Sequence, residues 1–571
     1  MKSSLNIAFL GNCTTDYLAQ ALQKKCKKYD IEATIYNCPY NQYQQDTLNT
    51  DSEFYQFRPE LTILFLEGSE LFPDWYTFPV LTSSKEKKYA LIEAVFDSLT
   101  AIVENIHTHS DTKIMVHNFK IPYFSPLGIL DNKNYPGLKD MISLLNLKLE
   151  EWACAKDYVY LFDYCGLCAN FGYENAADPK MYYIAKNTVS FPFMKILAGE
   201  YMRYILPLKF MTKKCLVLDL DNTLWGGVAG EDGISGIKLD ISGPGKSFYN
   251  FQKEILNLYH KGIILAINSK NNLEDGMNII ENHPHMALRK HHFSAWRINW
   301  HNKVDNLKEL AQELNIGIDS MVFFDDNPVE REFVKSMLPE VKVVDVPEDT
   351  SKYTETLKKI IEFEFLKITA EDMQRNIMYE ANQKRLASYQ QFENLEDYLA
   401  SLKMKVVLQH ANEFSIPRIA QLTQKTNQFN MTTKRYTQTD IENMVSSNNF
   451  LVFSCTVLDK FGDNGIVGVC IVELKDLSAH IDSFLLSCRV LGRNVEYAFI
   501  NKIISLLKEK GIKTVTGLYR KTEKNRANDN FYSQAGFSQE SVKERETLYR
   551  INTNQNLNDF HYINTVLEKE E

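Results

Sequence analysis

Cysteine is scarce in this chain: ten occur among 571 residues. They do not form the dense set of a disulfide framework, and they stand at Cys13, Cys26, Cys38, Cys154, Cys165, Cys168, Cys215, Cys455, Cys470 and Cys488. Sparse, scattered cysteines are typical of reduced thiols in a cytoplasmic protein. The pair Cys165 and Cys168 has no second pair and no HxxxH motif nearby, so it does not make a complete zinc site.

Long apolar runs and an excess of basic residues are also missing. No apolar run approaches the roughly 18 residues that span a bilayer. The first one, 5–10, is too short for a signal-peptide core and predicts a β-strand instead. Acidic residues outnumber basic ones, 73 to 64, which gives a formal net charge of −9. We therefore expect a cytoplasmic protein that binds neither nucleic acid nor membrane, while a local basic pocket for a phosphorylated ligand stays open.

The length and the local patterns predict five segments. At roughly 150 residues per domain, 571 residues suggest about three or four domains. We expect an α/β domain over 1–208, a second α/β domain over 209–348, a helical connector over 349–400, a third domain over 401–555 and a polar tail over 556–571. The sequence contains no repeat and no low-complexity tract.

Short apolar runs alternate with helical patterns, which predicts parallel α/β structure. In the first domain the strand-like runs are 6–10, 61–66, 113–117 and 158–162, with a long helix over 84–107. In the second domain strands are expected at 214–220, 263–268 and 321–325, with helices at 246–261 and 303–314. In the third, strands at 450–458, 465–473 and 480–487 lead into a helix at 495–510.

Two carboxylates follow the strand predicted at 214–220. Asp219 and Asp221 are spaced i, i+2 in the run CLVLDLDNTLW (215–225). Ligands of parallel α/β domains bind beyond the carboxyl ends of the strands. Because two neighbouring acids repel each other unless a cation or a shared proton compensates, the pair predicts a site for a hard cation such as Mg²⁺.

Further polar signals follow in order along the same domain. Ser269 ends the second strand, Lys303 opens a helix, and Asp325 and Asp326 end the third strand. Each motif alone has an ordinary interpretation as a turn, a helix cap or a solvated charge. Their common placement at strand ends and at a helix start favours one shared site.

Together these motifs resemble the four motifs of the haloacid dehalogenase (HAD) superfamily of phosphotransferases. The likeness lies in DLDNT (219–223), NSK (268–270), Lys303 and FFDDNP (323–328). The chain also resembles the FkbH-like branch, which belongs to HAD subfamily IIIC. This likeness lies in LWGGVAGEDGISGIKL (224–239), SKNN (269–272), NWHNK (299–303) and FFDDNPVERE (323–332). Later stretches resemble it too, namely QLTQKTNQFNMTTKRYT (421–437), DKFGDNGIVG (459–468) and SCRVLGRNVE (487–496). The resemblance thus covers nearly the whole chain.

The resemblance implies a role for each motif residue. Asp219 would attack phosphorus and form an aspartyl-phosphate, and Asp221 would act as general acid and then as general base. The residues that would bind the phosphoryl group are Thr223, which also orients the nucleophile loop, Ser269 and Lys303. The residues that would bind Mg²⁺ are Asp219, Asp221 through its backbone carbonyl, Asp325 and, directly or from the second shell, Asp326.

The spacing of the motifs also bears on access to the site. About 22 residues separate Thr223 from the next predicted helix, and about 33 separate Ser269 from Lys303. Neither gap is long enough for a complete α/β cap domain. We therefore expect an open site that admits a bulky or protein-borne substrate.

The third domain resembles the GNAT acyltransferase superfamily. Its turn RVLGRN (489–494) is similar to the pyrophosphate-binding pattern of that family, and NFYSQAGF (530–537) is similar to a later helix and turn. The resemblance implies that Arg489, Gly492, Arg493 and Asn494 bind coenzyme A or the phosphopantetheine arm of an acyl carrier protein. Asn494 departs from the family's usual Gly or Ala, which favours the protein-borne arm.

Cys488 precedes this turn, next to a basic residue. A thiol in such a position is a candidate thiolate nucleophile that carries an acyl group as a thioester. The alternative is a small buried side chain that only packs. Lys434 and Arg435 are either phosphate contacts or solvated charges.

The first domain resembles the SGNH hydrolases in its strand-end turn LGNCT (10–14), where Cys13 takes the place of the serine. The Asp-x-x-His partner pattern is absent, since 178–181 reads DPKM. We expect this domain to be non-catalytic and to dock a partner.

The sequence therefore predicts a multidomain α/β protein with a central HAD Rossmann-like domain between an SGNH-like α/β domain and a GNAT-like α+β domain. The implied function is a Mg²⁺-dependent phosphatase coupled to glyceryl transfer from a phosphorylated three-carbon donor, such as 1,3-bisphosphoglycerate, to a carrier-protein thiol. Two alternatives remain: a plain HAD phosphatase with a vestigial acyltransferase domain, and a non-enzymatic assembly protein of a biosynthetic complex.

Overall fold

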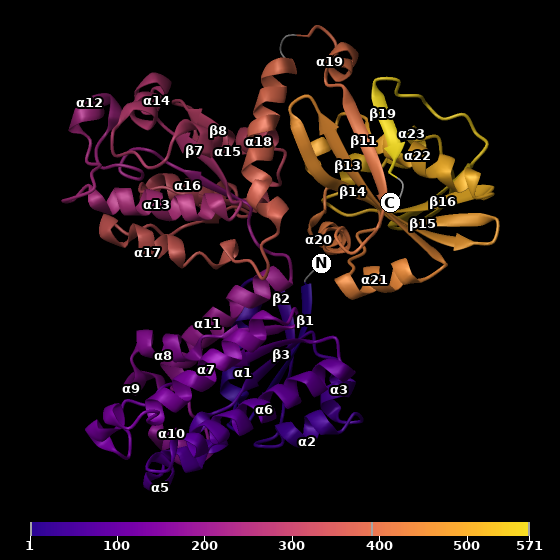
Figure 1. Cartoon of the computed structure of the whole chain (residues 1–571). Helices are drawn as coiled ribbons and strands as arrows, with labels where there is room; N and C mark the ends of the chain where they lie inside the picture. Colours follow the sequence, from indigo (N-terminus) through magenta and orange to yellow (C-terminus); the bar gives the residue numbers. More distant parts are fainter. Residues whose placement is uncertain (1–2, 390–391, 569–571) are drawn as a thin grey trace. The chain divides into compact units, whose positions relative to one another are not determined.

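The computed structural model describes residues 3–389 and 392–568. The chain divides into two compact units, Met1–Lys209 and Phe210–Glu571. Figure 1 labels the helices and strands of both units.

The first unit is built on a parallel sheet with the strand order β2-β1-β3-β4-β5. Its strands are β1 (Ser3–Gly11), β2 (Ile31–Asn37), β3 (Leu61–Phe65), β4 (Lys113–His117) and β5 (Val159–Phe162). The long helices are α1 (Asp16–Lys27), α6 (Lys85–His109), α7 (Leu138–Cys154) and α11 (Phe191–Leu208). Helix α1 packs against α11 and α6 against α7. Short helices join them: α2 (Tyr43–Leu48), α3 (Glu53–Phe57), α4 (Gly68–Leu71), α5 (Phe78–Leu81), α8 (Tyr164–Phe171), α9 (Tyr173–Ala176) and α10 (Pro179–Ala185).

The second unit contains a second parallel sheet, with the order β10-β9-β6-β7-β8. Its strands are β6 (Cys215–Leu218), β7 (Ile264–Ser269), β8 (Phe293–Ile298), β9 (Met321–Phe324) and β10 (Lys342–Val343). Its helices are α12 (Ala229–Gly236), α13 (Lys246–His260), α14 (Leu273–Asn282), α15 (Lys303–Glu313), α16 (Pro328–Met337) and α17 (Tyr353–Lys358).

The central strand β6 is buried on both faces. Leu216 and Leu218 lie in the core shared with α13, α14 and α17, while Cys215 and Val217 lie in the core shared with α15 and α16. This alternation follows from the two-residue period of a strand, and a parallel sheet covered on both faces needs apolar side chains at every position. This burial on both faces holds β6 in place in the sheet. It thereby also sets the position at which the residues after β6 leave the sheet.

The predicted connector is helical, with α18 (Ala370–Tyr389) and α19 (Leu395–Ser401). Its first part belongs to the core of the preceding domain, because Tyr353, Leu357, Ile360 and Phe363 pack there.

The C-terminal part of the second unit is a mixed sheet with the order β17-β18-β16-β15-β14-β13-β11-β19. Its strands are β11 (Met404–His410), β12 (Phe429–Asn430), β13 (Phe450–Asp459), β14 (Gly462–Lys475), β15 (Ser478–Leu486), β16 (Thr514–Arg520), β17 (Ser538–Lys543), β18 (Glu546–Asn552) and β19 (Ile563–Leu567). Its helices are α20 (Ile416–Lys425), α21 (Gln438–Ser446), α22 (Val495–Glu509) and α23 (Phe531–Gln534).

The parallel strands β15 and β16 pair only at their first residues, and β12 fills the space where they diverge. β15 pairs with β16 over Ser478–Ile481, and β12 pairs with β15 near its end. The Met431 N–H donates to the Phe484 carbonyl at 3.0 Å, and the Arg520 N–H donates to the Met431 carbonyl at 2.8 Å. The chain itself therefore bridges the two strands at their carboxyl ends.

The fold class predicted from the sequence is confirmed, with one difference at the end of the chain. We expected a polar tail over 556–571, but β19 within it joins the edge of the sheet beside β11. The stretch INTVL carries β-branched residues, and β11 offers a free backbone edge for it.

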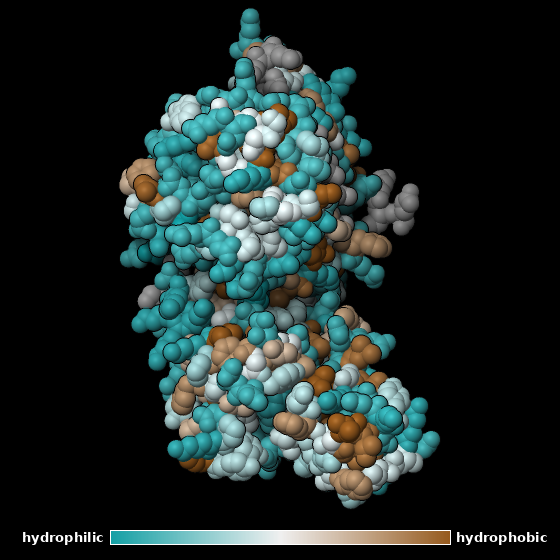
Figure 2. Space-filling model, turned by 90° about the vertical axis from the view of Figure 1, so that its left-hand side faces the viewer, coloured by the Kyte–Doolittle hydropathy of each residue, from teal (hydrophilic) through white to brown (hydrophobic). Residues whose placement is uncertain are grey.

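Among the described residues, no helix combines the length and the apolar character needed to cross a bilayer. Figure 2 shows hydrophilic side chains over most of one face, with hydrophobic ones in separate patches.

Candidate active site

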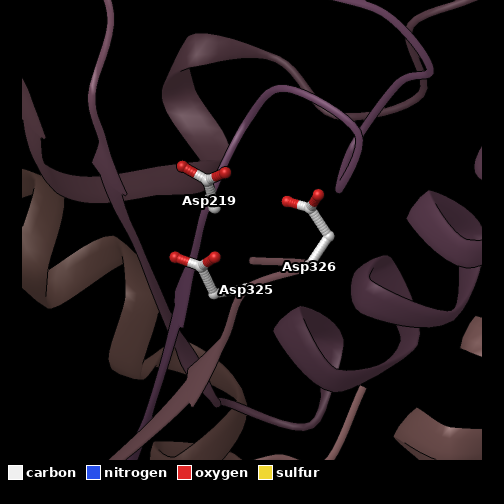
Figure 3. Close-up of side chains that lie close together, drawn as sticks. All are labelled: Asp219, Asp325 and Asp326. Carbon is white, nitrogen blue, oxygen red and sulfur yellow. The ribbon is translucent and has the colours of Figure 1, made fainter. Parts of the chain in front are cut away.

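Three carboxylates meet at the carboxyl end of the second parallel sheet. Asp219 directly follows β6, and Asp325 and Asp326 directly follow the adjacent strand β9. Each side chain offers one oxygen within 4.8 Å of the others. Figure 3 shows the three carboxylates gathered around one space. The strand pairing thus brings together residues that lie more than a hundred positions apart in the sequence.

Lys303 places a positive charge between two of these carboxylates. Its Nζ donates to Oδ1 of Asp219 at 2.8 Å and to Oδ2 of Asp325 at 2.5 Å. Lys303 is the first residue of α15, which Asn302 caps, and its backbone carbonyl accepts a hydrogen bond from Asn268. Burial opposes the charged form, but the carboxylates of Asp219 and Asp325 overcome it and raise the pKa of Lys303. The ammonium group is therefore held charged in the site.

One ammonium group does not balance three carboxylates. Burial, followed by the charge of Asp219, raises the pKa of both Asp325 and Asp326. The remaining negative charge and the all-oxygen donor set fit a hard divalent cation such as Mg²⁺. The residues present are thus suited to hold this ion.

Asp221 lies two residues after Asp219, in a hydrogen-bonded setting of its own. Its Oδ1 accepts from the Trp225 indole at 2.9 Å and from the Ala229 N–H at 3.0 Å, and its Oδ2 accepts from the Asn271 amide at 3.0 Å. Burial raises the pKa of Asp221 in spite of these donors. A fixed carboxyl group with a raised pKa suits proton transfer.

The other two predicted phosphate contacts lie beside this cluster. Ser269 is buried at the end of β7, the strand next to β6. Thr223 is buried, and its hydroxyl group donates to Oδ1 of Asp326 at 3.2 Å and accepts from the Asp326 N–H at 3.2 Å. Thr223 thus joins the loop after β6 to the loop after β9.

No inserted domain covers the site in the described part of the chain. Only the short helix α12 lies between β6 and α13, and only α14, a short 3-10 helix (Lys290–His292) and β8 lie between β7 and α15. The expectation of an uncapped site therefore agrees with the element order.

Comparison with known proteins gives the family. Residues 6–205 match the family model described as FkbH, N-terminal domain. The N-terminal part of the protein BF1531 from Bacteroides fragilis, whose crystal structure is described as containing a phosphatase domain complexed with Mg, is 30% identical, with a TM-score of 0.59, over 64% of this chain and 95% of that chain. The chain belongs to the FkbH-like HAD phosphatases.

Two acetyltransferases match about a quarter of this FkbH-like chain, and far more weakly. The ribosomal-protein-S18-alanine N-acetyltransferase from Escherichia coli is 10% identical, with a TM-score of 0.22, over 26% of this chain and 96% of that chain. A probable acetyltransferase from Staphylococcus epidermidis is 15% identical, with a TM-score of 0.22, over 26% of this chain and 99% of that chain. These values carry no conclusion about activity. No curated protein matches the FkbH-like chain.

The sequence reasoning missed three residues that shape the FkbH-like site. Trp225 and Asn271 hold the carboxylate of Asp221, and Arg331 donates to the backbone carbonyls of Asp325 and Asp326 at 2.8 and 2.6 Å. All three lie within stretches that carry the FkbH-like resemblance. The sequence therefore marked these positions but did not indicate what each side chain does.

Cys488 is not brought together with Asp219. It begins a short 3-10 helix, Cys488–Val490, and its backbone carbonyl accepts a hydrogen bond from Asn315. Asn315 lies before β9, at the amino end of the sheet, whereas Asp219 lies beyond the carboxyl end. The nucleophile and the thiol therefore lie at opposite ends of the same strands.

The predicted acyl-carrier turn is largely engaged with the protein itself. The Arg493 guanidinium donates to the Arg489 carbonyl at 2.7 Å and to Asn382 at 3.1 Å, and it lies 3.4 Å from the Asp459 carboxylate. Asn494 donates to the Tyr562 hydroxyl at 2.6 Å, and Gly492 is exposed with a φ of 77°. Arg489 donates to the Ser487 hydroxyl group at 3.1 Å and lines a cavity together with Cys488. Arg493 is thus committed to internal contacts.

The strand-end turn of the first unit is buried. Burial raises the pKa of the Cys13 thiol to about 12 and lowers the pKa of the neighbouring buried His117 to about 3. His117 contacts the Tyr201 hydroxyl at 3.0 Å, and Asp178 caps helix α10. That this domain is non-catalytic and docks a partner stays a prediction.

Proposed function

We propose that this chain is a Mg²⁺-dependent phosphohydrolase of HAD subfamily IIIC with Asp219 as its nucleophile. The observation that carries the proposal is the buried contact of Lys303 with Asp219 and Asp325, beside Asp326. A carboxylate and an ammonium group fixed at the ends of adjacent strands offer a nucleophile and a positive charge for the oxygens of a phosphoryl group.

The metal would be held by the acidic cluster. Asp219, Asp326 and the Asp221 backbone carbonyl would bind Mg²⁺. Asp325, expected from the sequence to be a direct ligand, would instead lie beside them, because Lys303 and the Asn327 N–H engage both of its oxygens. When bound, the ion neutralises negative charge, so that an anionic phosphoryl group and the Asp219 carboxylate can approach each other.

Two steps then use the residues of this chain. A carboxylate oxygen of Asp219 attacks phosphorus, a new P–O bond forms, and the bond to the leaving oxygen breaks while Asp221 donates a proton to that oxygen. Water then attacks phosphorus and Asp221 takes its proton. The bond to Asp219 breaks and phosphate leaves. Lys303 and Ser269 stabilise the charge on the phosphoryl oxygens in both steps.

Phosphate removal would be coupled to acyl transfer. In a donor such as 1,3-bisphosphoglycerate, the phosphate ester is the substrate of Asp219 and the acyl phosphate is the substrate of Cys488. The thiolate attacks the carbonyl carbon, a C–S bond forms, the C–O bond to phosphate breaks, and phosphate leaves. A carrier-protein thiol then takes the glyceryl group by thioester exchange and restores the Cys488 thiol. Cys488 is half-buried and lines a cavity together with Lys214 and Lys425, which supports this role.

One observation favours the alternative of a plain phosphatase. β12 occupies the space where the parallel strands β15 and β16 diverge, and Arg493 is engaged internally. Ligands of parallel strands bind at such carboxyl ends, and here the chain fills the place. Coenzyme A is therefore not expected at the turn before α22.

Phosphate release measured with and without Mg²⁺ tests the phosphatase. The wild-type chain should release phosphate from acetyl phosphate and 3-phosphoglycerate only with Mg²⁺, and Asp219→Asn should lower the rate about 10³-fold or more. Asp305→Asn, which removes an exposed carboxylate on α15, is the matched control and should keep the wild-type rate. An unchanged rate in Asp219→Asn would rule out the assignment.

A further inference from the structure

Three asparagine side chains form an amide network beside the phosphatase site. Asn268 belongs to β7, Asn299 follows β8, and Asn306 lies on α15. Asn268 and Asn306 are fully buried, and Asn299 is half-buried. The network therefore joins three elements that end or begin at the edge of the sheet where Asp219 lies.

Asn306 is the centre of this network. Its Nδ2 donates to Oδ1 of Asn268 at 3.0 Å and to Oδ1 of Asn299 at 3.0 Å. Its Oδ1 accepts a hydrogen bond from Nδ2 of Asn299 at 3.3 Å. An amide side chain offers two donor hydrogens and one acceptor oxygen, so the whole group is engaged. A satisfied buried network of this kind favours a single arrangement of the segments that it joins.

Two further hydrogen bonds connect the network to the predicted phosphate contacts. Nδ2 of Asn268 donates to the backbone carbonyl of Lys303 at 2.9 Å. The backbone N–H of Asn299 donates to the backbone carbonyl of Ser269 at 3.1 Å. Asn306 thus reaches Lys303 through one of its partners and Ser269 through the other.

An apolar side chain would be the ordinary choice at the position of Asn306. The other buried residues of α15 after Lys303 are all apolar, namely Val304, Leu307, Leu310 and Ala311. A buried amide costs free energy unless it is hydrogen-bonded, and a leucine would bury more apolar surface in the same place. Packing therefore does not explain the asparagine, whereas a need to fix the residues around it does.

The position of Lys303 matters because its ammonium group must meet the phosphoryl oxygens. Its Nζ lies 2.8 Å from Oδ1 of Asp219, and its own backbone is the part that Asn268 holds. A displacement of about 1 Å at a reacting group lowers the rate about 10²-fold. A shift of the first turn of α15 would carry the ammonium group away from the site.

We propose that Asn306 is a positioning residue, which fixes Lys303 and Ser269 for the transferring phosphoryl group. The inference rests on the proposed function, since it concerns the same site. Asn306 itself contacts no reacting group. Its effect should therefore be larger on the transition state, which needs all donors in place, than on a bound phosphate ion.

Calorimetry with two anions in the presence of Mg²⁺ tests this expectation. Orthovanadate imitates the transferring phosphoryl group, and phosphate is the product. Asn306→Leu, which keeps the approximate size and removes the amide, should weaken orthovanadate binding about tenfold or more and phosphate binding by less than about threefold. Gln312→Leu replaces an exposed amide on the same helix and should leave both affinities unchanged.

A double variant separates positioning from folding. Asn306→Leu alone leaves Oδ1 of Asn268 without its buried donor, which should lower the stability to urea. Replacement of both partners of a buried hydrogen bond by apolar groups is nearly neutral or stabilising. Asn268→Leu combined with Asn306→Leu should therefore recover stability, yet still bind orthovanadate about tenfold more weakly than the wild type. Recovery of orthovanadate affinity together with stability would overturn the inference.

A milder variant covers the case in which the leucine variants do not fold. Asn299→Ala removes one partner at a half-buried position and should weaken orthovanadate binding about threefold. If the wild type binds orthovanadate and neither Asn306→Leu nor Asn299→Ala binds it more weakly, the inference alone is overturned. If orthovanadate does not bind the wild type with Mg²⁺, the phosphatase assignment is contradicted and the inference falls with it.

Discussion

The ammonium group of Lys303 lies 2.8 Å from the carboxylate oxygen of Asp219, and both groups are buried. A buried ion pair is weak evidence for stability, because desolvation of both charges opposes it. Here the pair belongs to a cluster with two further carboxylates. A role of this cluster in catalysis and metal binding therefore explains the buried pair better than a contribution to the stability of the fold.

Removing the ammonium group should destabilise the protein and make its stability depend on Mg²⁺. Lys303→Met leaves three carboxylates without a cation, and breaking a buried pair costs about 3–5 kcal/mol. We expect a loss of this size in the free energy of urea unfolding without Mg²⁺, and partial recovery with Mg²⁺. Lys308→Met, at an exposed position of the same helix, should change it by less than about 0.5 kcal/mol. Equal losses in the two variants would contradict this account.

The two acids after β9 should differ in their effect on metal binding. The Asp325 carboxylate is engaged on both oxygens, by Lys303 and by the Asn327 N–H, while Thr223 holds one oxygen of Asp326. We therefore expect Asp326→Asn to raise the Mg²⁺ dissociation constant about 10- to 100-fold, and Asp325→Asn to have the smaller effect on it.

Calorimetric titration with Mg²⁺ measures both constants. The exposed Glu274 on α14 offers a control, and Glu274→Gln should bind as the wild type does. A larger loss in Asp325→Asn than in Asp326→Asn would reverse the assignment.

Glu496 should make the stability of the C-terminal domain depend on pH. It is buried in the first turn of α22, its Oε2 has no hydrogen-bond partner among the described residues, and burial raises its pKa to about 7. An acid whose pKa is raised on folding binds its proton more tightly in the folded state, so its contribution to stability is lost as the pH rises from about 4.5 to about 7.

Glu496→Gln mimics the protonated acid and should remove this loss. Urea unfolding should show the variant more stable than the wild type by about 1–3 kcal/mol at pH 8, and equal to it near pH 4.5. A variant that is less stable than the wild type at both pH values would show that the carboxylate has a partner.

Cys488 should carry the acyl group if the transfer reaction takes place. Intact-mass measurement after incubation with 1,3-bisphosphoglycerate should show a glyceryl adduct in the wild type. The adduct should be lost in Cys488→Ser and kept in Cys154→Ser, which removes an exposed thiol. An adduct that survives in Cys488→Ser would place the acyl group elsewhere. No adduct in any form of the chain would favour the plain phosphatase.

Much of the central domain could be predicted because its strands are buried on both faces. The expected strand 214–220 corresponds to β6, and the helices expected at 246–261 and 303–314 correspond to α13 and α15 within one residue. Strand β2 of the first unit, with partly exposed side chains, and β8 of the central domain, which follows a histidine-rich turn, lack a continuous apolar run and were missed. A strand could therefore be predicted where its sequence is a continuous apolar run, and β8 shows that burial alone is not enough.

The candidate site could be predicted as a set of residues but not as a set of contacts. The order of the strands, which places Asp325 beside Asp219, follows from pairing between distant segments. The internal engagement of Arg493 also depends on how segments more than a hundred residues apart pack together. Local sequence patterns do not predict contacts between such distant segments.

Direct detection of the phosphorylated residue tests the central claim most sharply. Acetyl phosphate can phosphorylate Asp219 without a general acid, because acetate leaves without a proton, whereas hydrolysis of the aspartyl-phosphate needs Asp221 as base. Incubation of Asp221→Asn with acetyl phosphate and Mg²⁺, followed by an acid quench and peptide mass spectrometry, should therefore find the phosphoryl group on Asp219. A phosphoryl group on another residue, or none while phosphate release continues in Asp219→Asn, would contradict the account.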